Sequence, residues 1–178
     1  IDGKFAWWAQ VRMDSALKVG LRRLHRQGLR CLQAGIESGS PRILKLICKD
    51  ETVETMLEAN RVIAQTPIKP LYDFMMGFPT ETYEDQMQTV DLAMRMLDEN
   101  PNAEMTGIYS YVPYPGTKMY ELAQEHGFVP PATIEGWAHF TRQSLLTPWQ
   151  QEQGVRYRSI LTMSKFIDGT RMVRRMRD

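Results

Sequence analysis

Four short apolar segments along the chain have the pattern of β-strands. They are residues 5–11, 29–36, 71–76 and 105–112. The first is rich in aromatic residues and apolar on both faces, which is typical of a buried strand. The last alternates between apolar and polar positions, as a strand with two different faces does. These segments predict four strands.

The apolar residues that follow the first strand recur at helical spacing. After Asp14, which is a favourable N-cap, Leu17, Leu21 and Leu24 fall on one face of a helix. Gly28 is suited to the C′ position that ends such a helix. The pattern predicts one short amphipathic helix here.

Further helices are expected after each of the other strands. Residues 41–64 should be helical, with a break near 49–50 and a restart at Thr52, and residues 118–125 should form a helix that ends at Gly127. Between them lies a helix whose apolar positions step by four and three residues, the period of a core-facing helix. These positions are Tyr83, Met87, Val90, Met94 and Leu97.

The strands and helices alternate in four units of similar length. Such a repeat predicts an α/β fold with a parallel sheet and right-handed crossovers. After Pro130 and Pro131 the repeat stops, and a long helical stretch is expected from about Val155. We therefore expect four parallel strands with flanking helices, followed by a C-terminal helical appendage.

Composition adds little to this picture except at the C-terminus. The chain has 178 residues, 43% hydrophobic and 24% charged, which is typical of a soluble domain. A net charge of +1 gives no reason to expect nucleic acid or an anionic membrane as partner. The C-terminal tail is the exception, because it carries a cluster of basic residues. This cluster could be a solvated helix end or could contact an anionic partner. Its residues are Arg171, Arg174, Arg175 and Arg177.

Two cysteines, Cys31 and Cys48, are too few for a disulfide framework or a structural zinc site. We expect Cys31 to be buried in its strand and Cys48 to be inert at a helix end. No apolar run is long enough to span a membrane, and the N-terminus does not resemble a signal peptide. A cytoplasmic location is expected.

Unusual polar and glycine-containing stretches follow each predicted strand. In parallel α/β folds the carboxyl ends of the strands carry the ligand site, although glycine and proline there can also serve as ordinary turn residues. Arg12 and Glu37 are more informative, because an ionised group at the end of an apolar strand must be paired or solvated. They could form a mutual salt bridge or hold a polar ligand. The stretches are residues 12–14, 37–40, 77–82 and 113–117.

These stretches resemble, in order and spacing, the radical S-adenosylmethionine superfamily. The similarity is greatest to the branch in which a cobalamin-binding domain often precedes the radical domain, near the methylthiotransferases. It implies that residues 1–128 are the third to sixth β/α units of a partial barrel, and that residues 129–178 are a helical extension. The motifs are Trp8-Ala9-Gln10-Val11-Arg12-Met13-Asp14, Gly35-Ile36-Glu37-Ser38-Gly39-Ser40, Ile47-Cys48-Lys49 with Thr52, Gly77-Phe78-Pro79-Thr80-Glu81-Thr82 and Pro113-Tyr114-Pro115-Gly116-Thr117.

The resemblance also implies cofactors that this chain does not hold by itself. The family binds a [4Fe–4S] cluster on a Cys-x-x-x-Cys-x-x-Cys loop after the first barrel strand, and two cysteines cannot supply three thiolates. We expect the cluster in the parent protein only, and cobalamin, if used, on a separate domain. The parent would be a methyltransferase or an oxidoreductase of the cyclase type with a small-molecule substrate. This chain alone would not be catalytically competent.

The site residues implied by the resemblance bind the adenosyl cofactor, and none is catalytic or a metal ligand. Glu37 and Ser38 would lie near the ribose and the methionyl part, and Arg12 would engage the methionyl carboxylate. Other residues would turn the chain beneath the adenine or contact its edge. These are Gly77, Phe78, Pro79, Val112 and Pro113.

Two alternatives stay open at this point. The chain could be a complete non-redox α/β domain that binds a nucleotide or adenosyl ligand, or a nucleic-acid-binding module that uses its basic tail. In a truncated barrel the first strand, residues 5–11, would have an unpaired edge. We expect that edge to be covered by the C-terminal appendage or by a second copy of the chain, and the missing N-terminal half of the barrel is expected as a further partner.

Overall fold

The computed structural model describes residues 5–138 and 147–167 and divides the chain into two units. The first unit comprises Ile1–Phe74 and Tyr83–Thr106, and the second comprises Met75–Thr82 and Gly107–Asp178. The basic tail cluster predicted at residues 171–177 lies outside the described residues.

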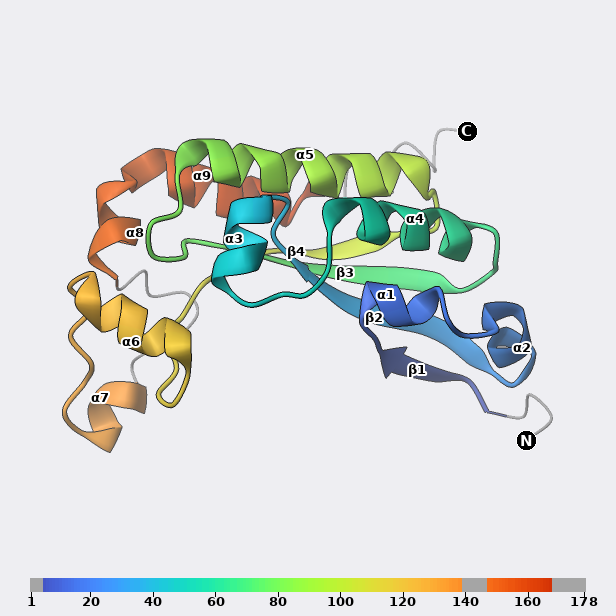
Figure 1. Ribbon diagram of the computed structural model, residues 1–178, viewed down its shortest axis with the longest axis horizontal. Helices are drawn as coiled ribbons and strands as arrows, with labels where there is room; N and C mark the ends of the chain where they lie inside the picture. Colours follow the sequence, from blue (N-terminus) through green and yellow to red (C-terminus); the bar gives the residue numbers. More distant parts are fainter. Residues whose placement is uncertain (1–4, 139–146, 168–178) are drawn as a thin grey trace. The chain divides into compact units, whose positions relative to one another are not determined.

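The four predicted strands are present and form one sheet in chain order (Figure 1). Strand β1 pairs in parallel with β2, and β2 pairs in parallel with β3. The register of the second pair places Gly35 opposite Asp73, with an irregularity between Gly35 and Glu37. The predicted parallel sheet is confirmed. The strands are β1 (Trp7–Gln10), β2 (Leu29–Glu37), β3 (Lys69–Met76) and β4 (Glu104–Ser110).

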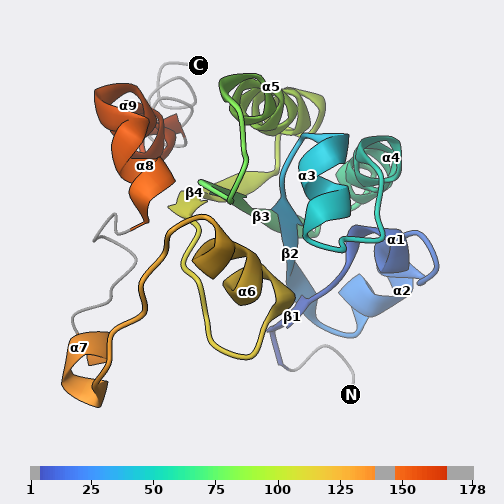
Figure 2. The same ribbon diagram turned by 60° about the vertical axis from the view of Figure 1, so that its left-hand side comes forward.

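Helices of the first unit cover one face of its strands (Figure 2). The side chains of β2 and β3 that face them, among them Leu32, Ile36, Tyr72 and Phe74, are buried. Side chains at the alternate positions of these strands are only half-buried, so the sheet has one apolar and one more open face. The helices are α1 (Met13–Ala16), α2 (Leu21–Arg26), α3 (Pro41–Leu46), α4 (Val53–Ala64) and α5 (Tyr83–Glu99).

The helix predicted between Asp14 and Gly28 is wrong as a single element. The structure has two short helices, α1 and α2, and Asp14 lies inside α1 rather than at its N-cap. Gly20 is the N-cap of α2 with a φ of −77° and a ψ of 77°, which lies outside the helical region. The chain turns there before Leu21 is buried.

The predicted helix break between residues 41 and 64 is confirmed. Ser40 caps α3 by accepting a hydrogen bond from the backbone N–H of Ile43 at 3.3 Å. Thr52 caps α4 in the same way, accepting from the N–H of Thr55 at 3.2 Å. Each cap satisfies a backbone donor that the first helical turn leaves without a partner.

Helix α5 buries a different face from the one predicted. Met94, expected in the core, is 42% exposed, and Tyr83 is exposed as well. Asp85 and Thr89 are buried instead, because they hydrogen-bond to serine side chains in the loop after β2. Apolar periodicity cannot detect a face that is half polar. The buried face consists of Asp85, Gln86, Thr89, Leu92, Ala93, Met96 and Leu97.

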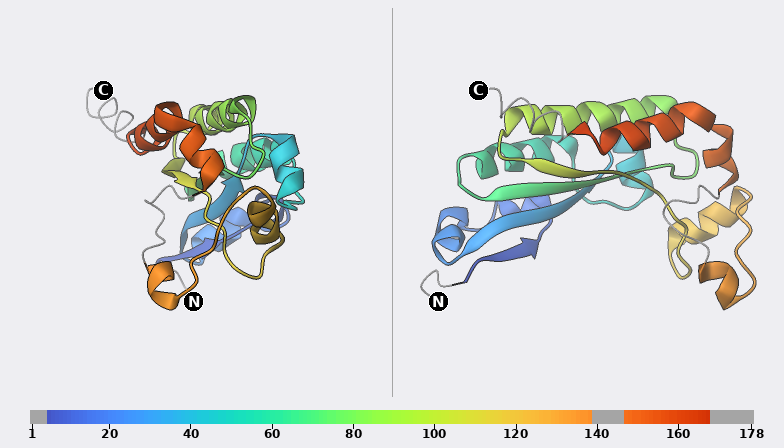
Figure 3. Two further views of the ribbon diagram at one scale, coloured as in Figure 1. Left: turned by 90° about the vertical axis from the view of Figure 1, so that its left-hand side faces the viewer. Right: turned by 180° about the vertical axis from the view of Figure 1, so that it is seen from behind.

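Strand β1 is more exposed than its apolar sequence predicts. Trp8 is 60% exposed and Phe5 more so, because β1 ends the strand order and, within residues 5–138 and 147–167, pairs only with β2. The right-hand view of Figure 3 shows β1 beside β2. The expectation of a buried strand is wrong, and what covers its edge stays a prediction. Cys31, expected to be fully buried in β2, is only half-buried, and Cys48 is exposed.

The second unit contains the predicted helix over residues 118–125 and the C-terminal helices. Tyr157 of α9 is buried, and its hydroxyl donates to the Met76 carbonyl at 3.1 Å and shares a 2.9 Å hydrogen bond with Ser110. These contacts place α9 against the ends of β3 and β4. The proposed boundary after residue 128 stays a prediction. The helices are α6 (Lys118–Glu125), α7 (Ile134–Ala138), α8 (Pro148–Glu152) and α9 (Gly154–Ser164).

No helix in the described residues is both long enough and apolar enough to cross a lipid bilayer.

Candidate functional site

Each predicted site residue follows the carboxyl end of its strand. Arg12 and Glu37 lie at the ends of β1 and β2 in the first unit. Gly77 and Val112 follow β3 and β4 and belong to the second unit. The predicted site residues thus fall into two groups, one in each unit.

Arg12 is held at the start of α1 by its own loop and by a neighbouring one. Its Nε lies 3.2 Å from Oδ1 of Asp14, and its Nη2 donates to the Asp50 carbonyl at 3.0 Å. The side chain stays 46% exposed. The hydrogen bond from Arg12 lowers the pKa of the Asp14 carboxyl, and the same bond raises the pKa of Arg12. The guanidinium is thus oriented but still accessible.

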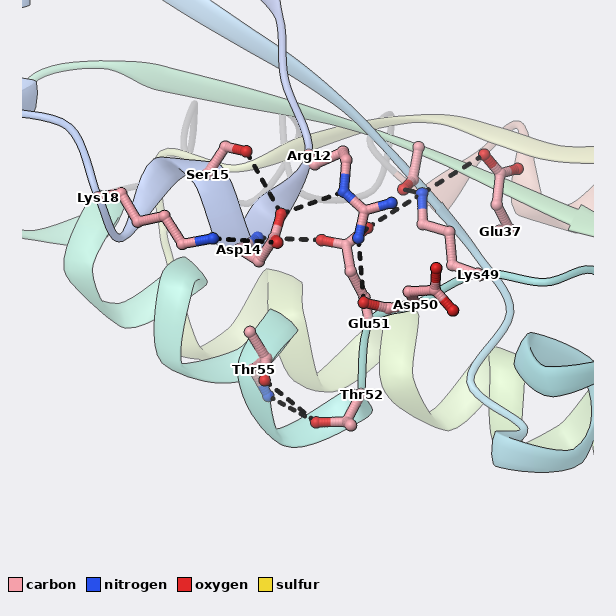
Figure 4. Close-up of polar contacts among 11 residues, drawn as sticks. Arg12, Asp14, Ser15, Lys18, Glu37, Lys49, Asp50, Glu51, Thr52 and Thr55 are labelled. Atoms are coloured by element: carbon pink, nitrogen blue, oxygen red, sulfur yellow. Dashed lines mark hydrogen bonds and ion pairs between the residues drawn. The ribbon is translucent and has the colours of Figure 1, made fainter.

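Glu51 is a buried carboxylate between the charged residues of this corner (Figure 4). Its side chain is 0% exposed, and Oε1 accepts from the backbone N–H of Asp14 at 2.9 Å. Its Oε2 lies 3.2 Å from Nζ of Lys49 and 3.9 Å from Nη2 of Arg12. A buried carboxylate is tolerated only with such partners. Glu51 therefore connects the loop after β1 with the loop between α3 and α4.

Glu37 ends β2 in an unusual backbone conformation. Its φ is 65°, a left-handed value that is rare for residues other than glycine and is often found at functional sites. The carboxylate folds back over Gly35, where an added Cβ would lie 2.3 Å from Oε1 of Glu37. Burial raises the pKa of Glu37, while the charge of Lys49, whose Nζ is 4.0 Å from Oε1, opposes this effect.

Arg12 and Glu37 do not form the mutual salt bridge that was one prediction from sequence. Among the described residues, the structure connects them through Glu51 and Lys49. Sequence reasoning missed Glu51 and gave Lys49 no role of its own. The available signal was the run Lys49-Asp50-Glu51, three charged residues at a helix break.

Ser38 faces the protein interior. Its fully buried hydroxyl lies 3.0 Å from the hydroxyl of Thr89 and accepts from the N–H of Ser40 at 3.1 Å. Ser40 in turn donates to Asp85, which also binds Arg42. This network holds the loop after β2 against α5. It favours a supporting role for Ser38, and the predicted contact with the methionyl group stays a prediction.

A row of polar side chains crosses the more open face of the sheet in the first unit. Asp73 accepts from Nε2 of Gln33 at 2.6 Å and from the hydroxyl of Thr106 at 2.7 Å. A second helical layer would need apolar residues at these positions, so this face is better suited to a ligand. Sequence reasoning missed the row, although polar residues inside three predicted strands were the signal.

The loop after β3 is tied down within the second unit. The Gly77 carbonyl accepts from Nε1 of Trp149 at 2.8 Å and from Nε2 of Gln150 at 2.9 Å, and its N–H donates to Glu81. The ring of Phe78 lies 5.1 Å from that of Tyr111. Both hydrogen-bonding groups of Gly77 are therefore used inside the protein.

The other residues predicted near adenine lie on the same two loops of the second unit. Phe78, Pro79, Val112 and Pro113 are all buried. The backbone beside Val112 is fixed because Gln150 also donates to the Tyr111 carbonyl at 2.9 Å. The expected adenine contacts of Gly77, Phe78, Pro79, Val112 and Pro113 stay a prediction.

The donor set of this chain does not fit an iron–sulfur cluster. Such a cluster of this family needs three thiolates, and the chain has only Cys31 and Cys48. Cys31 lies within β2 and Cys48 follows α3, so they belong to different elements. In the described part of the chain, no group of three His, Cys, Asp or Glu side chains could hold a metal ion.

Comparisons with known proteins agree with this geometry. Residues 12–93 match the radical SAM superfamily. The chain is 29% identical over 118 residues to an uncharacterised methyltransferase of Pyrococcus horikoshii, covering 66% of this chain and 25% of that protein. It is 33% identical over 122 residues to the tRNA-2-methylthio-N(6)-dimethylallyladenosine synthase of Paracoccus denitrificans, covering 67% and 25%. The chain thus spans about a quarter of the length of these relatives.

A solved structure shares the fold. The Elp3 protein of Methanocaldococcus infernus, with residues 1–46 deleted, superposes with a TM-score of 0.50 and 22% identity. The match covers 67% of this chain and 28% of that one. At this identity the likeness concerns the fold alone, and it supports a partial α/β barrel.

Proposed function

Because the chain belongs to the radical SAM superfamily, we propose that it supplies the S-adenosylmethionine-binding strand ends of a radical SAM enzyme. One observation carries this proposal. Arg12 and Glu37, at the carboxyl ends of the neighbouring parallel strands β1 and β2, each lie within 4.0 Å of a member of the ion pair that Lys49 forms with the buried Glu51. A cation and a carboxylate thus lie on one edge of the sheet.

These two groups match the chemistry of the cofactor. The guanidinium of Arg12 uses Nε and Nη2 within the protein, which leaves Nη1 to donate to the methionyl carboxylate. An ionised carboxylate such as Glu37 accepts hydrogen bonds only, so it suits the two hydroxyls of a ribose. The proposed orientation places the methionyl end of the ligand toward β1 and its ribose toward β2.

The polar row extends the proposed site along the sheet. Gln33 and Thr106 use their donors on Asp73, and a carboxylate has further lone pairs to offer. We assign this row to the polar part of the substrate, which would lie beside the adenosyl group. The hydrogen bonds from Gln33 and Thr106 fix the orientation of the Asp73 carboxylate. They therefore also fix the side from which a hydrogen-bond donor of the substrate approaches it.

When bound, the cluster of this family supplies the electron that cleaves S-adenosylmethionine, and the protein contributes orientation. The cysteines of this chain cannot hold that cluster. We propose that its ligands belong to another part of the parent protein and that this chain is inactive alone. A cobalamin domain, if the parent has one, would likewise lie outside residues 1–178.

The relatives favour group transfer in the parent enzyme. One is named a methyltransferase and the other a methylthio-forming synthase. We therefore favour a methyltransferase or methylthiotransferase as the parent enzyme over an oxidoreductase of the cyclase type. The small-molecule substrate is left open by the residues present.

Calorimetry tests the cofactor proposal directly. S-adenosylmethionine and S-adenosylhomocysteine should bind the full chain, and Arg12→Gln or Glu37→Gln should weaken binding at least about tenfold, the loss of one charge-assisted contact. Arg61→Gln and Glu99→Gln are matched controls, because this exposed ion pair lies on α4 and α5. Equal losses in all four variants would contradict the proposal. Tighter, phosphate-dependent binding of nucleotides would support the non-redox alternative instead.

Anaerobic iron–sulfur reconstitution tests the proposal that the cluster ligands belong to another part of the parent protein. The chain should fail to form a stoichiometric [4Fe–4S] cluster and should not cleave S-adenosylmethionine. Adding the cysteine-containing part of the parent protein should allow both cluster formation and S-adenosylmethionine cleavage. Cluster formation by this chain alone would overturn the proposal that its ligands lie elsewhere.

A further inference from the structure

Lys49 contacts three oxygen atoms from three segments of the first unit. Its Nζ donates to the Gly35 carbonyl at 2.6 Å and lies 3.2 Å from Oε2 of Glu51 and 4.0 Å from Oε1 of Glu37. The Gly35 contact is a hydrogen bond, whereas the contacts with the two carboxylates are ion pairs within 4.0 Å. With 15% of its side chain exposed, Lys49 is directed at the protein rather than at solvent.

The Gly35 carbonyl and the Glu51 carboxylate together hold Lys49 in position. The fully buried Glu51 carboxylate is itself oriented by the backbone N–H of Asp14. The contact with Glu51 is shorter than the contact with Glu37, so Glu51 is the main counter-charge of Lys49. Glu37 is left close to a positive charge without being tightly bound by it.

The surroundings of Glu37 otherwise favour its neutral form. Partial burial penalises its charge, and two other carboxylates face it, Asp73 from β3 and Glu51 from the loop before α4. Lys49 is the one cation among the charged groups that act on Glu37 in the described residues. Removing it would leave a half-buried carboxylate among like charges, which binds a proton more readily.

We infer that Lys49 is a positioning residue for Glu37: it keeps this carboxylate ionised and folded over Gly35, so that it can accept hydrogen bonds from a ribose. This inference deepens the proposed function and rests on it for the identity of the ligand. Lys49 does not contact the ligand itself. Its contribution passes through Glu37, whose ionised form has only acceptors, whereas the protonated form turns one oxygen into a donor.

Carboxyl NMR titration of Glu37 tests the inference without any ligand. Lys49→Met should raise the pKa of Glu37 relative to the unsubstituted chain, and Lys49→Arg should restore most of the difference. Lys45→Met, on the exposed face of α3, should leave the titration unchanged. An unchanged pKa of Glu37 in a folded Lys49→Met protein would overturn the inference.

Ligand binding provides the second readout. Lys49→Met should weaken S-adenosylhomocysteine binding more at pH 6 than at pH 8, by up to about tenfold for each unit of pKa change. A purely structural loss would be the same at both pH values and would count against the inference. If the unsubstituted chain binds no adenosyl ligand, the proposed function fails, while the Glu37 titration still decides the role of Lys49.

Folding of the variant does not limit the test. In the unsubstituted chain, the side-chain ¹⁵N signal of Lys49 should shift with pH at the same midpoint as the Glu37 carboxyl. Such coupling is expected for charges about 4 Å apart in a partly buried site. A Lys49 signal that ignores the Glu37 titration would contradict the inference even if Lys49→Met does not fold.

Discussion

The hydroxyl of Tyr72 donates to Oδ1 of Asn60 at 2.6 Å, and both side chains are fully buried. The same asparagine donates through Nδ2 to the Met96 carbonyl at 2.9 Å. One polar side chain thus connects β3, α4 and α5 in the core of the first unit. Its two hydrogen bonds explain why a polar residue is tolerated where α4 packs against α5.

Tyr72→Phe should destabilise the first unit by about 1–3 kcal/mol, because Oδ1 of Asn60 would lose its donor in a buried position. Urea denaturation of the full chain measures this change. Tyr114→Phe is the matched control, since the Tyr114 side chain is exposed and should lose almost nothing. Equal stability of the two variants would show that water can replace the Tyr72 hydroxyl.

Gly39→Ala should be severely destabilising. A Cβ at this position would lie 2.2 Å from the backbone carbonyl of Gln88 and 2.9 Å from Cβ of Leu92. Neither neighbour is the end of a flexible side chain, so the loop after β2 would have to move away from α5 at a cost of about 1–3 kcal/mol or more. Gly20→Ala, whose nearest contact is 3.7 Å, should be tolerated in the same thermal unfolding assay.

Gln150→Leu should release the loops of the second unit. The amide of Gln150 donates to the carbonyls of Gly77 and Tyr111, and leucine would leave the Tyr111 carbonyl without this donor. We expect a loss of about 1–3 kcal/mol, seen as faster amide hydrogen exchange over residues 75–82 and 107–112. Trp149→Phe should have a smaller effect, because Gly77 keeps its bond to Gln150. Faster exchange in Trp149→Phe than in Gln150→Leu would show that Trp149, and not Gln150, is the side chain that mainly holds these loops.

Glu37→Gln should stabilise the chain at neutral pH. Burial raises the folded-state pKa of Glu37 above its ordinary value, so the folded state holds this proton more tightly than the unfolded state. The free energy of unfolding then falls as the pH rises from the ordinary pKa through the folded one, and glutamine removes that loss. Urea denaturation between pH 4 and pH 8 should show a gain that disappears at the acidic end.

Glu99 provides the opposite pH dependence. Hydrogen bonds from Arg61 and Arg95 lower its pKa, so its contribution is present at neutral pH and is lost as the pH falls through the folded-state pKa. Glu99→Gln should therefore reduce stability slightly at pH 7 and have no effect in strong acid. A loss of stability for Glu37→Gln at pH 7 would contradict the raised pKa of Glu37, and a gain for Glu99→Gln would contradict the lowered pKa of Glu99.

The stability gain expected for Glu37→Gln and the binding loss expected for the same variant have one cause. If Glu37 binds the ligand as proposed, its partly buried carboxylate destabilises the ligand-free protein. Calorimetry and denaturation on the same sample would measure both effects. A variant that gains stability and keeps its affinity would argue against a ligand at Glu37.

Local sequence patterns are enough to predict the four strands, most of the helices and the polar stretches that follow the strands. Alternation with period two, helix caps such as Thr52 and helix-ending glycines such as Gly127 are local features, and their effects extend over a few residues. For the same reason the sequence placed Arg12 and Glu37 at strand ends, and both side chains are partly exposed there.

Tertiary structure alone decided which of these residues meet. It turned α5 so that Asp85 and Thr89 are buried, joined Arg12 to Glu37 through Glu51 and Lys49, and collected Gln33 and Thr106 around Asp73. A charge or hydroxyl can be buried only where a partner from another segment satisfies it. That condition depends on distances between remote parts of the chain, which local periodicity does not contain.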